Sequence, residues 1–274
     1  MLFVRAWQQP WKPKESQLLD MGTSLINSRQ EAGKRRRRTR VADHAPLECA
    51  ACQHRQSGWF CSFGRSIQSD VELSATTISL PAQTSLFVQG DEARCLYLVC
   101  GGYLKLTAGR SSGKRVVVRV AGPGHLLGLY AVLSHGVYEV SAESLTPTQL
   151  RPVEKERFQQ YLHDHKDAQM RAAHCICLEY RIALQNSCRI ALAETVAARL
   201  GRLLLDLGHQ IGRRGEDGKL RIPLLLTHEE MASMAVTTRE TVTRTLSQFR
   251  KEGWISIHDA TVTIENPHVL DALL

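Results

Sequence analysis

The most regular alternation of hydrophobic and polar positions lies close to the C-terminal end of the chain. Val242, Leu246 and Phe249 recur at spacings of four and three residues, which is typical of the helix face that packs on a core. The polar positions on the opposite side are Arg239, Glu240, Thr243, Arg244 and Ser247. The pattern predicts an amphipathic helix with one buried face and one polar, solvent-facing side.

Two helix starts lie ten residues apart in this region. Thr227 and Glu230 form a capping-box pattern, in which the threonine oxygen accepts from a helical amide and the glutamate bonds back to the amide of the threonine. Thr237 and Glu240 repeat the pattern, so a tight turn around residues 235–237 must join the two helices. This arrangement predicts a helix-turn-helix.

The segment after Gly253 adds a wing to this motif. Two β-prone runs, residues 254–257 and 261–264, flank a turn at residues 258–260. The polar helix face has two interpretations, a solvated surface with Arg–Glu pairs or a surface that reads DNA. An arginine can donate two hydrogen bonds to guanine and a glutamate can accept one from cytosine. The neighbouring wing favours double-stranded DNA as the partner.

The middle of the chain changes from strand-like to helical patterning. Over residues 71–153, short apolar runs alternate with glycine-containing turns, which predicts an all-β roll or sandwich. Residues 155–209 lack proline and predict helices. One helical stripe with a spacing of three and four residues predicts a seam for pairing with a second copy: Cys177, Tyr180, Leu184, Ser187 and Ala191. The alternative is a helix that packs on its own domain.

Charge and composition refine the picture. The net charge of +8 and the pI of about 9.2 suit a polyanionic partner. Residues 1–48 have no sustained periodicity and include the basic run 34–40, which predicts a disordered basic arm. No segment is apolar enough to span a membrane, and the first residues lack a signal-peptide core. We therefore expect a cytoplasmic protein with no membrane partner.

Eight cysteines are many for a protein of a reducing compartment, where thiols serve as metal ligands, redox groups or packing residues. Cys49, Cys52 and Cys61 fall within thirteen residues. Three others lie in the predicted long helix and are expected to be buried as small apolar residues: Cys175, Cys177 and Cys188. A C-x-x-C pair can also exchange disulfides, but this one lies in polar coil rather than at a helix start. A dithiol oxidoreductase, and an enzyme in general, is therefore disfavoured.

Three groups of residues resemble the Crp/Fnr family of bacterial transcription regulators. They are residues 88–91 with 96–99 and Gly102, residues 124–128, and residues 239–244. The resemblance covers residues 71–274 and implies an α+β fold. Its expected parts are a cyclic-nucleotide-binding-type β-roll, or jelly roll (71–165), a dimerisation helix (166–192) and a winged helix-turn-helix (193–274), preceded by a cysteine-rich segment (49–70).

The family resemblance also implies how the chain works. A homodimer would bind palindromic DNA, with bases read through the positions Arg239, Glu240, Thr243 and Arg244, and would contact RNA polymerase if it activates transcription. Nucleotide-binding members carry a Glu after the glycine of the phosphate cassette and an Arg about ten residues later. Here Leu129 follows Gly128 and Glu139 occupies the arginine position. A carboxylate there would repel a phosphate, so we expect no cyclic nucleotide.

The cysteine-rich segment is the alternative sensor. Oxygen-sensing Fnr-type members carry three cluster ligands ahead of the roll, where this chain has Cys49, Cys52 and Cys61. The resemblance implies an iron–sulfur cluster, 4Fe-4S, that responds to oxygen, nitric oxide or redox state. The fourth cysteine position of the family falls near Gln149, and Cys100 or Cys95 on a neighbouring strand is the expected replacement. Zinc or a thiol switch at the three cysteines, or no effector, remain the alternatives.

Overall fold

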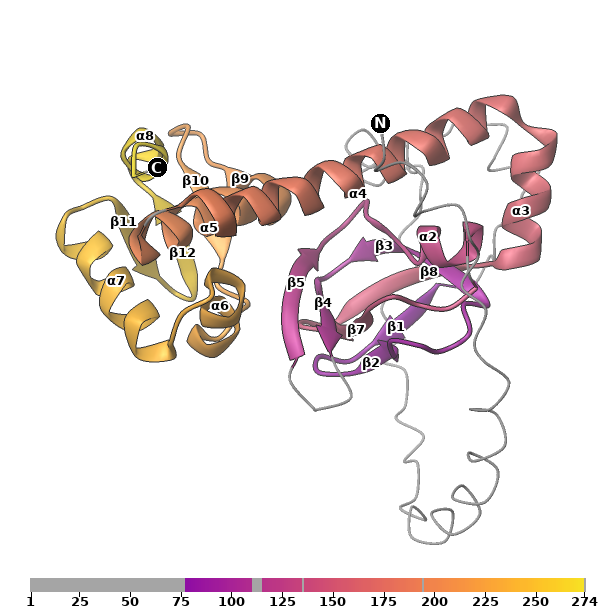
Figure 1. Ribbon diagram of the computed structural model, residues 1–274, viewed down its shortest axis with the longest axis horizontal. Coiled ribbons are helices and arrows are strands. Elements are labelled where there is room, and N and C mark those ends of the chain that lie inside the picture. Colours follow the sequence, from indigo (N-terminus) through magenta and orange to yellow (C-terminus); the bar gives the residue numbers. More distant parts are fainter. Residues whose placement is uncertain (1–76, 110–114, 135, 194, 274) are drawn as a thin grey trace, which may run out of the picture. The chain divides into compact units, whose positions relative to one another are not determined.

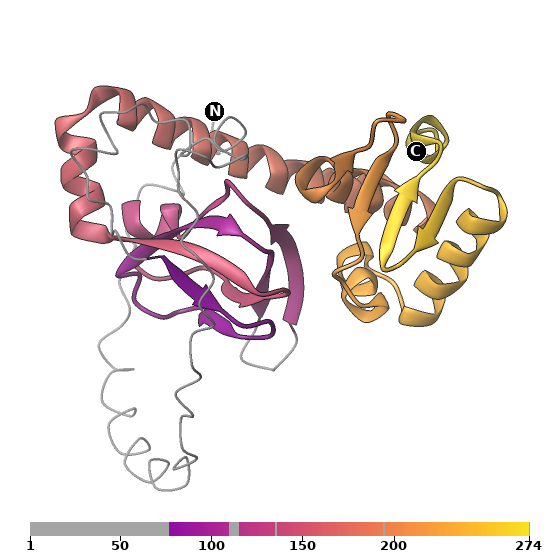
Figure 2. The same ribbon diagram turned by 180° about the vertical axis from the view of Figure 1, so that it is seen from behind.

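The structure, a computed structural model, describes residues 77–109, 115–134, 136–193 and 195–273 (Figures 1 and 2). The predicted basic arm and the cysteine-rich segment, with Cys49, Cys52 and Cys61, lie outside the described residues. The described part contains a two-sheet β-roll, a series of helices and a C-terminal winged domain. The predicted α+β fold is confirmed.

The β-roll consists of two antiparallel sheets around one hydrophobic core. The first sheet has the order β1 (Ile78–Leu80), β8 (Thr148–Glu154), β3 (Cys95–Gly101) and β6 (Leu126–Leu127). The second has the order β2 (Ser85–Phe87), β7 (Ser141–Ser144), β4 (Leu104–Gly109) and β5 (Arg115–Ala121). Fully buried core residues include Leu96, Val99, Leu104, Leu127 and Leu150. The apolar runs that predicted strands therefore supply the core of the roll.

Helices follow the roll in sequence. The short α2 (Leu129–Leu133) lies within the roll, and α3 (Lys155–Asp164), α4 (Lys166–Leu192) and α5 (Val196–Ile211) come after β8. His165 and Ala193 adopt extended backbone angles and interrupt the helical stretch without a glycine or proline. Thr195 then starts α5, because its side chain accepts a hydrogen bond of 3.0 Å from the Ala198 amide. The long helix spans the residues predicted for it.

The C-terminal domain is a winged helix. α6 (His228–Ala235) and α7 (Arg239–Lys251) share a core with α5 and with a sheet of four strands. The sheet has the order β11 (Ile255–His258), β12 (Thr261–Ile264), β10 (Leu220–Pro223) and β9 (Arg213–Arg214), and α8 (Pro267–Asp271) follows it. The two predicted wing strands are confirmed. Their turn has two residues, Asp259 and Ala260, rather than the predicted three.

The two helix starts of the helix-turn-helix differ from each other. The capping box of Thr227 and Glu230 is present in full at the start of α6. At the start of α7 the predicted cap, Thr237, is wrong by one residue: Thr238 accepts a hydrogen bond of 3.3 Å from the Thr241 amide. The turn between the helices needs a left-handed residue, and Val236 supplies it with φ of 51°. A left-handed conformation is unusual for a β-branched residue, so the helices on either side must hold it in place.

No helix among the described residues is both long enough and apolar enough to cross a lipid bilayer.

Replacing Thr238 with alanine should lower the free energy of unfolding by about 1 kcal/mol, because α7 loses the side chain that caps its first turn. Thr237→Ala is the matched control, since it removes the same hydroxyl one residue earlier, where that hydroxyl bonds none of the described residues. Urea unfolding of both variants measures the difference. An equal loss at Thr237 would contradict the assignment of the cap.

Candidate nucleic-acid interface and ligand cavities

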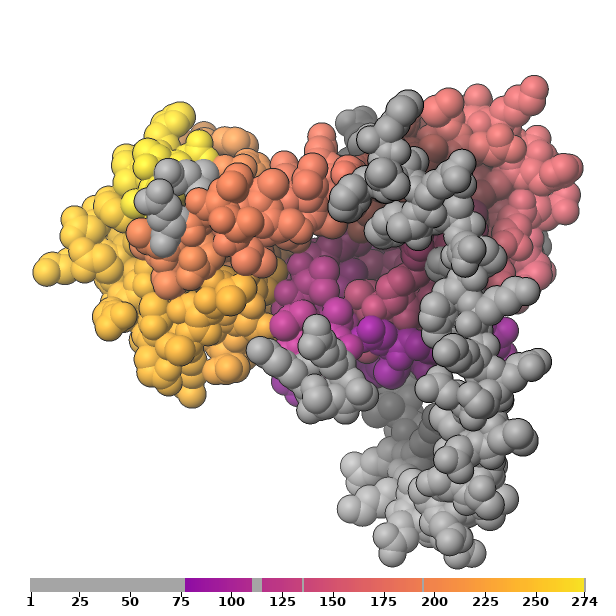
Figure 3. Space-filling model, viewed as in Figure 1, coloured from indigo at the N-terminus to yellow at the C-terminus, as the bar shows by residue number. Residues whose placement is uncertain are grey.

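The two sides of α7 are separated as the sequence predicts. Val242, Leu246 and Phe249 are only 0%, 3% and 1% exposed, and they join the core of the winged domain. The predicted DNA-reading residues are all exposed: Arg239, Glu240, Thr243, Arg244 and Ser247. In Figure 3 the C-terminal domain, to which α7 belongs, is coloured orange and yellow. Sequence periodicity thus places these five polar side chains together on one accessible helix side.

The polar side chains of α7 differ in how many bonds they already make. The Thr243 hydroxyl donates to the Arg239 carbonyl at 3.0 Å and lies 2.8 Å from His228 Nδ1. The Ser247 hydroxyl donates to the Thr243 carbonyl at 2.9 Å. Arg244, in contrast, has no hydrogen bond or ion pair with any residue that the structure describes. Its guanidinium is therefore available to a partner, whereas the hydroxyls are partly engaged.

Glu240 lies in the first turn of α7, beside the helix cap. Hydrogen bonds from its own backbone amide and from the Thr238 hydroxyl lower the pKa of its carboxyl, so the side chain is ionised near neutral pH. His228, at the start of α6, contacts Thr243 on the same surface and was not identified from the sequence. Because α6 is short, its sequence shows no periodic pattern that would have predicted on which side of the helix His228 lies.

Two arginines hold the end of α6. The guanidinium of Arg199 on α5 donates to the Ala235 carbonyl at 2.8 Å, and Arg189 on α4 approaches the Met234 carbonyl at 3.5 Å. These carbonyls belong to the last turn of α6, where a helix has no internal donors left. Arg189 is 5% exposed and also pairs with Asp206 on α5 at 3.1 Å. The helix-turn-helix is thereby attached to both helices that precede it.

The roll contains a cavity of about 200 Å³ at the position expected for an effector. Gly128, Leu129 and Glu139 line it, so the residues compared with the nucleotide-binding cassette do lie together. The sequence comparison missed a cation here. Arg119 of β5 also lines the cavity, is 6% exposed, and pairs with Glu179 of α4 at 2.9 Å. The guanidinium in this cavity is thus already matched by a carboxylate.

The two candidates for a fourth cysteine ligand lie at different ends of β3. In the register of β3 with β8, Val99 faces Leu150 and Gly101 faces Gln149, so Cys100 lies directly beside the Gln149 position. Cys95 faces Glu154 at the far end. Burial, together with Glu154 and Glu156, raises the pKa of the Cys95 thiol. Within the described residues, no group of three or more His, Cys, Asp or Glu side chains could hold a metal ion.

The predicted seam of α4 is solvent-exposed in the single chain. Tyr180 is 69% exposed and Leu184 is 49% exposed, and the other seam positions are exposed as well: Cys177, Ser187 and Ala191. The expectation that all three cysteines of this helix are buried is wrong for Cys177 and Cys188. Only Cys175 faces the roll core. Tyr180 and Leu184 form the apolar part of this exposed stripe, and Ser187 makes it partly polar.

Known proteins match both halves of this architecture. The family model of the cyclic nucleotide-binding domain matches residues 77–165, and that of the Crp-like helix-turn-helix domain matches residues 198–273. The global nitrogen regulator of Synechocystis sp. is 31% identical over 195 residues, which cover 68% of this chain and 83% of that protein. The CRP-like cAMP-activated global transcriptional regulator of Mycobacterium tuberculosis is 23% identical over 189 residues, 69% of this chain and 84% of that protein.

Solved structures agree at the level of the fold. The structure of FixK2 from Bradyrhizobium japonicum superposes with a TM-score of 0.65 at 20% identity, over 72% of this chain and 96% of that one. The similar proteins are regulators rather than enzymes, which agrees with the prediction that this chain is not an enzyme. The family models, the relatives and the fold together show that the chain belongs to the Crp/Fnr family of transcriptional regulators, with a helix-turn-helix DNA-binding domain.

Proposed function

We propose that this regulator binds palindromic DNA as a homodimer and reads bases with the exposed side of α7. The proposal rests on the Arg244 side chain, which is exposed and has no hydrogen bond or ion pair among the described residues. It lies on the same side of the helix as Arg239 and Glu240. An unpaired guanidinium on an accessible helix can donate two hydrogen bonds to guanine O6 and N7 in the major groove. A recognition helix presents its N-terminal half to base edges, which is where these residues lie.

The remaining side chains of this surface have different roles in the proposal. Glu240 would repel phosphates, so its ionised carboxylate is useful there only as an acceptor for a base donor such as cytosine N4. Thr243 and Ser247 each keep acceptor capacity on the hydroxyl oxygen after donating to the helix backbone. We assign them to shorter contacts beside the two charged readers. Base preference would then depend mainly on Arg244 and Glu240.

Replacing Arg244 with alanine should lower the preference for a palindromic site by about 1–3 kcal/mol per half-site, because a bidentate base contact is lost. Weak, salt-sensitive binding to any DNA should persist through phosphate contacts. Fluorescence anisotropy with specific and scrambled duplexes at two salt concentrations measures both the sequence preference and the salt-sensitive, non-specific affinity. Arg157→Ala on α3 removes the same charge in the roll and should leave the preference unchanged. An undiminished preference in the Arg244 variant would contradict the assignment.

The dimer in this proposal forms along α4. Its seam positions are exposed in the single chain and include the large apolar side chains Tyr180 and Leu184. Burying such side chains against a second copy removes apolar surface from water, at about 25 cal/mol per Å². A parallel, symmetric pairing would place each seam residue opposite its own copy. The two recognition helices would then face the two half-sites of a palindrome together.

Mild oxidation should cross-link the dimer through Cys177, because a symmetric seam brings the two copies of this thiol together. Non-reducing electrophoresis should show a covalent dimer that disappears in Cys177→Ser and persists in Cys175→Ser, whose thiol is buried toward the roll. Tyr180→Asp should shift the protein toward monomer in sedimentation velocity, since it buries a carboxylate in an apolar seam. A monomeric wild-type protein would refute the pairing.

We infer further that the roll itself does not respond to cyclic nucleotide. Its cavity of about 200 Å³ is smaller than the roughly 300–1,000 Å³ typical of small-molecule sites. The Arg119 guanidinium in it is paired with Glu179, and Glu139 adds a second carboxylate to the lining. A cyclic phosphate would have to displace the Glu179 carboxylate from the buried Arg119 guanidinium in order to obtain a cation.

We propose an iron–sulfur cluster, 4Fe-4S, as the effector group, with Cys49, Cys52, Cys61 and Cys100 as its ligands. The proposal rests on the C-x-x-C spacing and on the place of Cys100. The chain enters the roll at β1, whose Ser79 pairs with Gln149, and β8 separates β1 from β3. Cys100 is thus two strands, or roughly 10 Å, from the strand that follows the cysteine segment. A bound cluster would supply sensitivity to oxygen or nitric oxide.

The same register argues against Cys95 as the fourth ligand. A ligand must be a thiolate, and burial together with two nearby glutamates raises the pKa of the Cys95 thiol. Its position opposite Glu154 also lies beyond the residues of β8 that pair with β1. Zinc bound to the three N-terminal cysteines is the alternative metal, and it would give a colourless protein.

Anaerobically purified protein should show a broad absorbance near 400 nm that bleaches in air, with iron and sulfide in equal amounts. Cys100→Ser should lower the cluster content several-fold, whereas the matched change Cys95→Ser should leave it within experimental error. A colourless protein that contains zinc would contradict the iron–sulfur proposal and support zinc as the bound metal. A colourless, metal-free protein would refute both, without affecting the DNA-binding proposal.

A further inference from the structure

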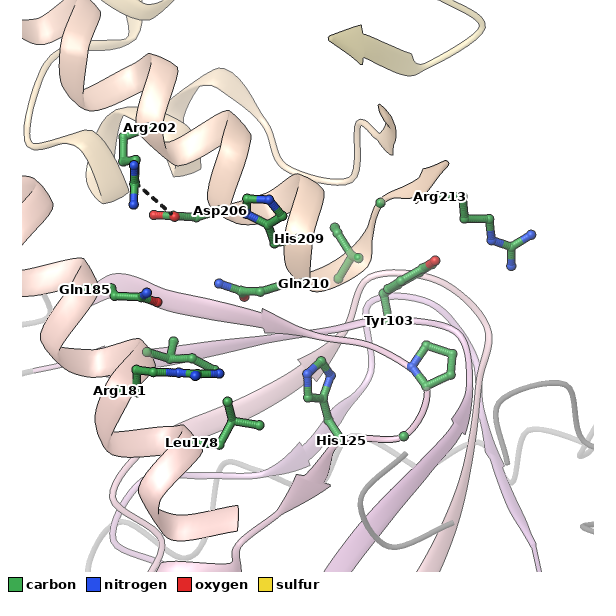
Figure 4. A pocket seen from close by; sticks show the side chains of 15 residues that line it. Tyr103, His125, Leu178, Arg181, Gln185, Arg202, Asp206, His209, Gln210 and Arg213 are labelled. Carbon is green, nitrogen blue, oxygen red and sulfur yellow. Dashed lines mark ion pairs between the residues drawn. The ribbon is translucent and has the colours of Figure 1, made fainter. Parts of the chain in front are cut away.

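A second and larger cavity, of about 690 Å³, lies between the loop that leads into β6, the middle of α4 and the end of α5 (Figure 4). Its lining and that of the smaller roll cavity have only Ile182 in common among the described residues. The volume falls within the range of small-molecule sites, roughly 300–1,000 Å³. The cavity is therefore large enough for a metabolite and distinct from the site discussed above.

The charged groups of this cavity are mostly cationic. Among the described residues that line it are three arginines and a single carboxylate, Asp206. This carboxylate already has cationic partners, with Arg189 at 3.1 Å and Arg202 at 3.5 Å. Arg202 also pairs with Asp271 at 2.7 Å. The ion pairs within the protein thus account for Asp206 and Arg202 and leave the other two lining arginines unmatched.

The side chains of Arg181 and Arg213 make no hydrogen bond or ion pair with any residue in the described ranges. In Figure 4, the Arg181 side chain extends from α4 across the cavity toward His125. Arg213 lies at the far edge of the cavity, two residues beyond the end of α5, and its guanidinium points away from Arg181 in Figure 4. A guanidinium that reaches into a partly enclosed space attracts an anion more strongly than it would in bulk water. Arg181 can therefore hold an anionic group through charge-assisted hydrogen bonds, and Arg213 adds positive charge at the cavity edge.

The neutral polar groups around the cavity suit anionic oxygens as well. Gln185 on α4 and Gln210 on α5 lie on facing walls and can each donate through a side-chain amide (Figure 4). Burial and the neighbouring Arg119 lower the pKa of His125 to about 4, so its ring is neutral near pH 7. The Gly122 amide lies 2.8 Å from His125 Nδ1 and fixes the ring in place. The wall thus combines the unpaired guanidinium of Arg181 with neutral side-chain donors on both helices.

We propose that this cavity binds a small organic anion with at least two carboxylate or phosphate groups. Such a ligand would contact Arg181 on α4 with one anionic group and the side-chain amide of Gln210 on α5 with another, while Gln185 donates to its remaining oxygens. Its contacts would bridge the interruption at Ala193 between the long helix and the DNA-binding domain. The proposal adds a metabolite site to the cysteine-based sensor and does not depend on it.

Isothermal titration of the full-length protein with pyrophosphate and with citrate tests this site and separates the two sources of anionic oxygen. We expect saturable binding of at least one probe at one site per chain. Arg181→Gln should weaken that binding at least tenfold, and Arg213→Gln should weaken it by a smaller factor. Arg214→Gln is the matched control, since it removes the same charge on the adjacent residue outside the cavity, and should change the affinity less than twofold.

The DNA-binding surface is also cationic, so Arg244→Ala is titrated in parallel. Affinity that falls in Arg244→Ala and not in Arg181→Gln would place the anion on α7 and overturn the proposal. Equal weakening in Arg181→Gln and Arg214→Gln would show general charge attraction and would also overturn it. The proposal would also be overturned if neither pyrophosphate nor citrate bound at millimolar concentration. All these outcomes leave the preference for palindromic DNA, measured separately, unaffected.

Discussion

The ion pair between Arg189 and Asp206 determines how the DNA-binding domain is attached to the long helix. Arg189 is almost fully buried near the end of α4, and Asp206 lies in the middle of α5. A buried guanidinium without a partner would cost several kcal/mol, so the two helices must keep this carboxylate next to it. The same guanidinium reaches the Met234 carbonyl at the end of α6. One buried charge therefore connects the long helix, α5 and the helix-turn-helix.

Much of the fold could be predicted because it depends on local patterns. The stripe of Val242, Leu246 and Phe249 identified the core side of α7, and the five polar positions opposite it are exposed as predicted. The capping box at Thr227 located the start of α6 correctly. The second cap was placed one residue early because Thr237 has Glu240 three residues later and completes the box pattern, whereas Thr238 caps α7 without a box. Only the backbone geometry of the turn decides between them.

The parts that could not be predicted depend on contacts between distant residues. Arg119 and Glu179 are sixty positions apart, and no sequence pattern links the end of β5 to the middle of α4. The larger cavity likewise combines residues of the roll, α4 and α5, none of which forms a motif alone. The turn of the helix-turn-helix contains no glycine and has Val236 in the left-handed region. Its position could be inferred only from the two helix starts around it.

The charges at the two ends of α6 suggest how the rest of the molecule can influence the recognition helix. At its first turn, Glu230 caps the helix and also pairs with Lys105 of β4 at 2.9 Å, and Lys105 in turn pairs with Glu143 of β7. At its last turn, Arg189 and Arg199 reach the free carbonyls from α4 and α5. α6 is thus bound by the roll at one end and by the long helices at the other. α7 packs on α6 through buried side chains, so a shift of the roll or of α4 would reach the exposed side of α7, the proposed DNA-reading surface, by moving α6 first.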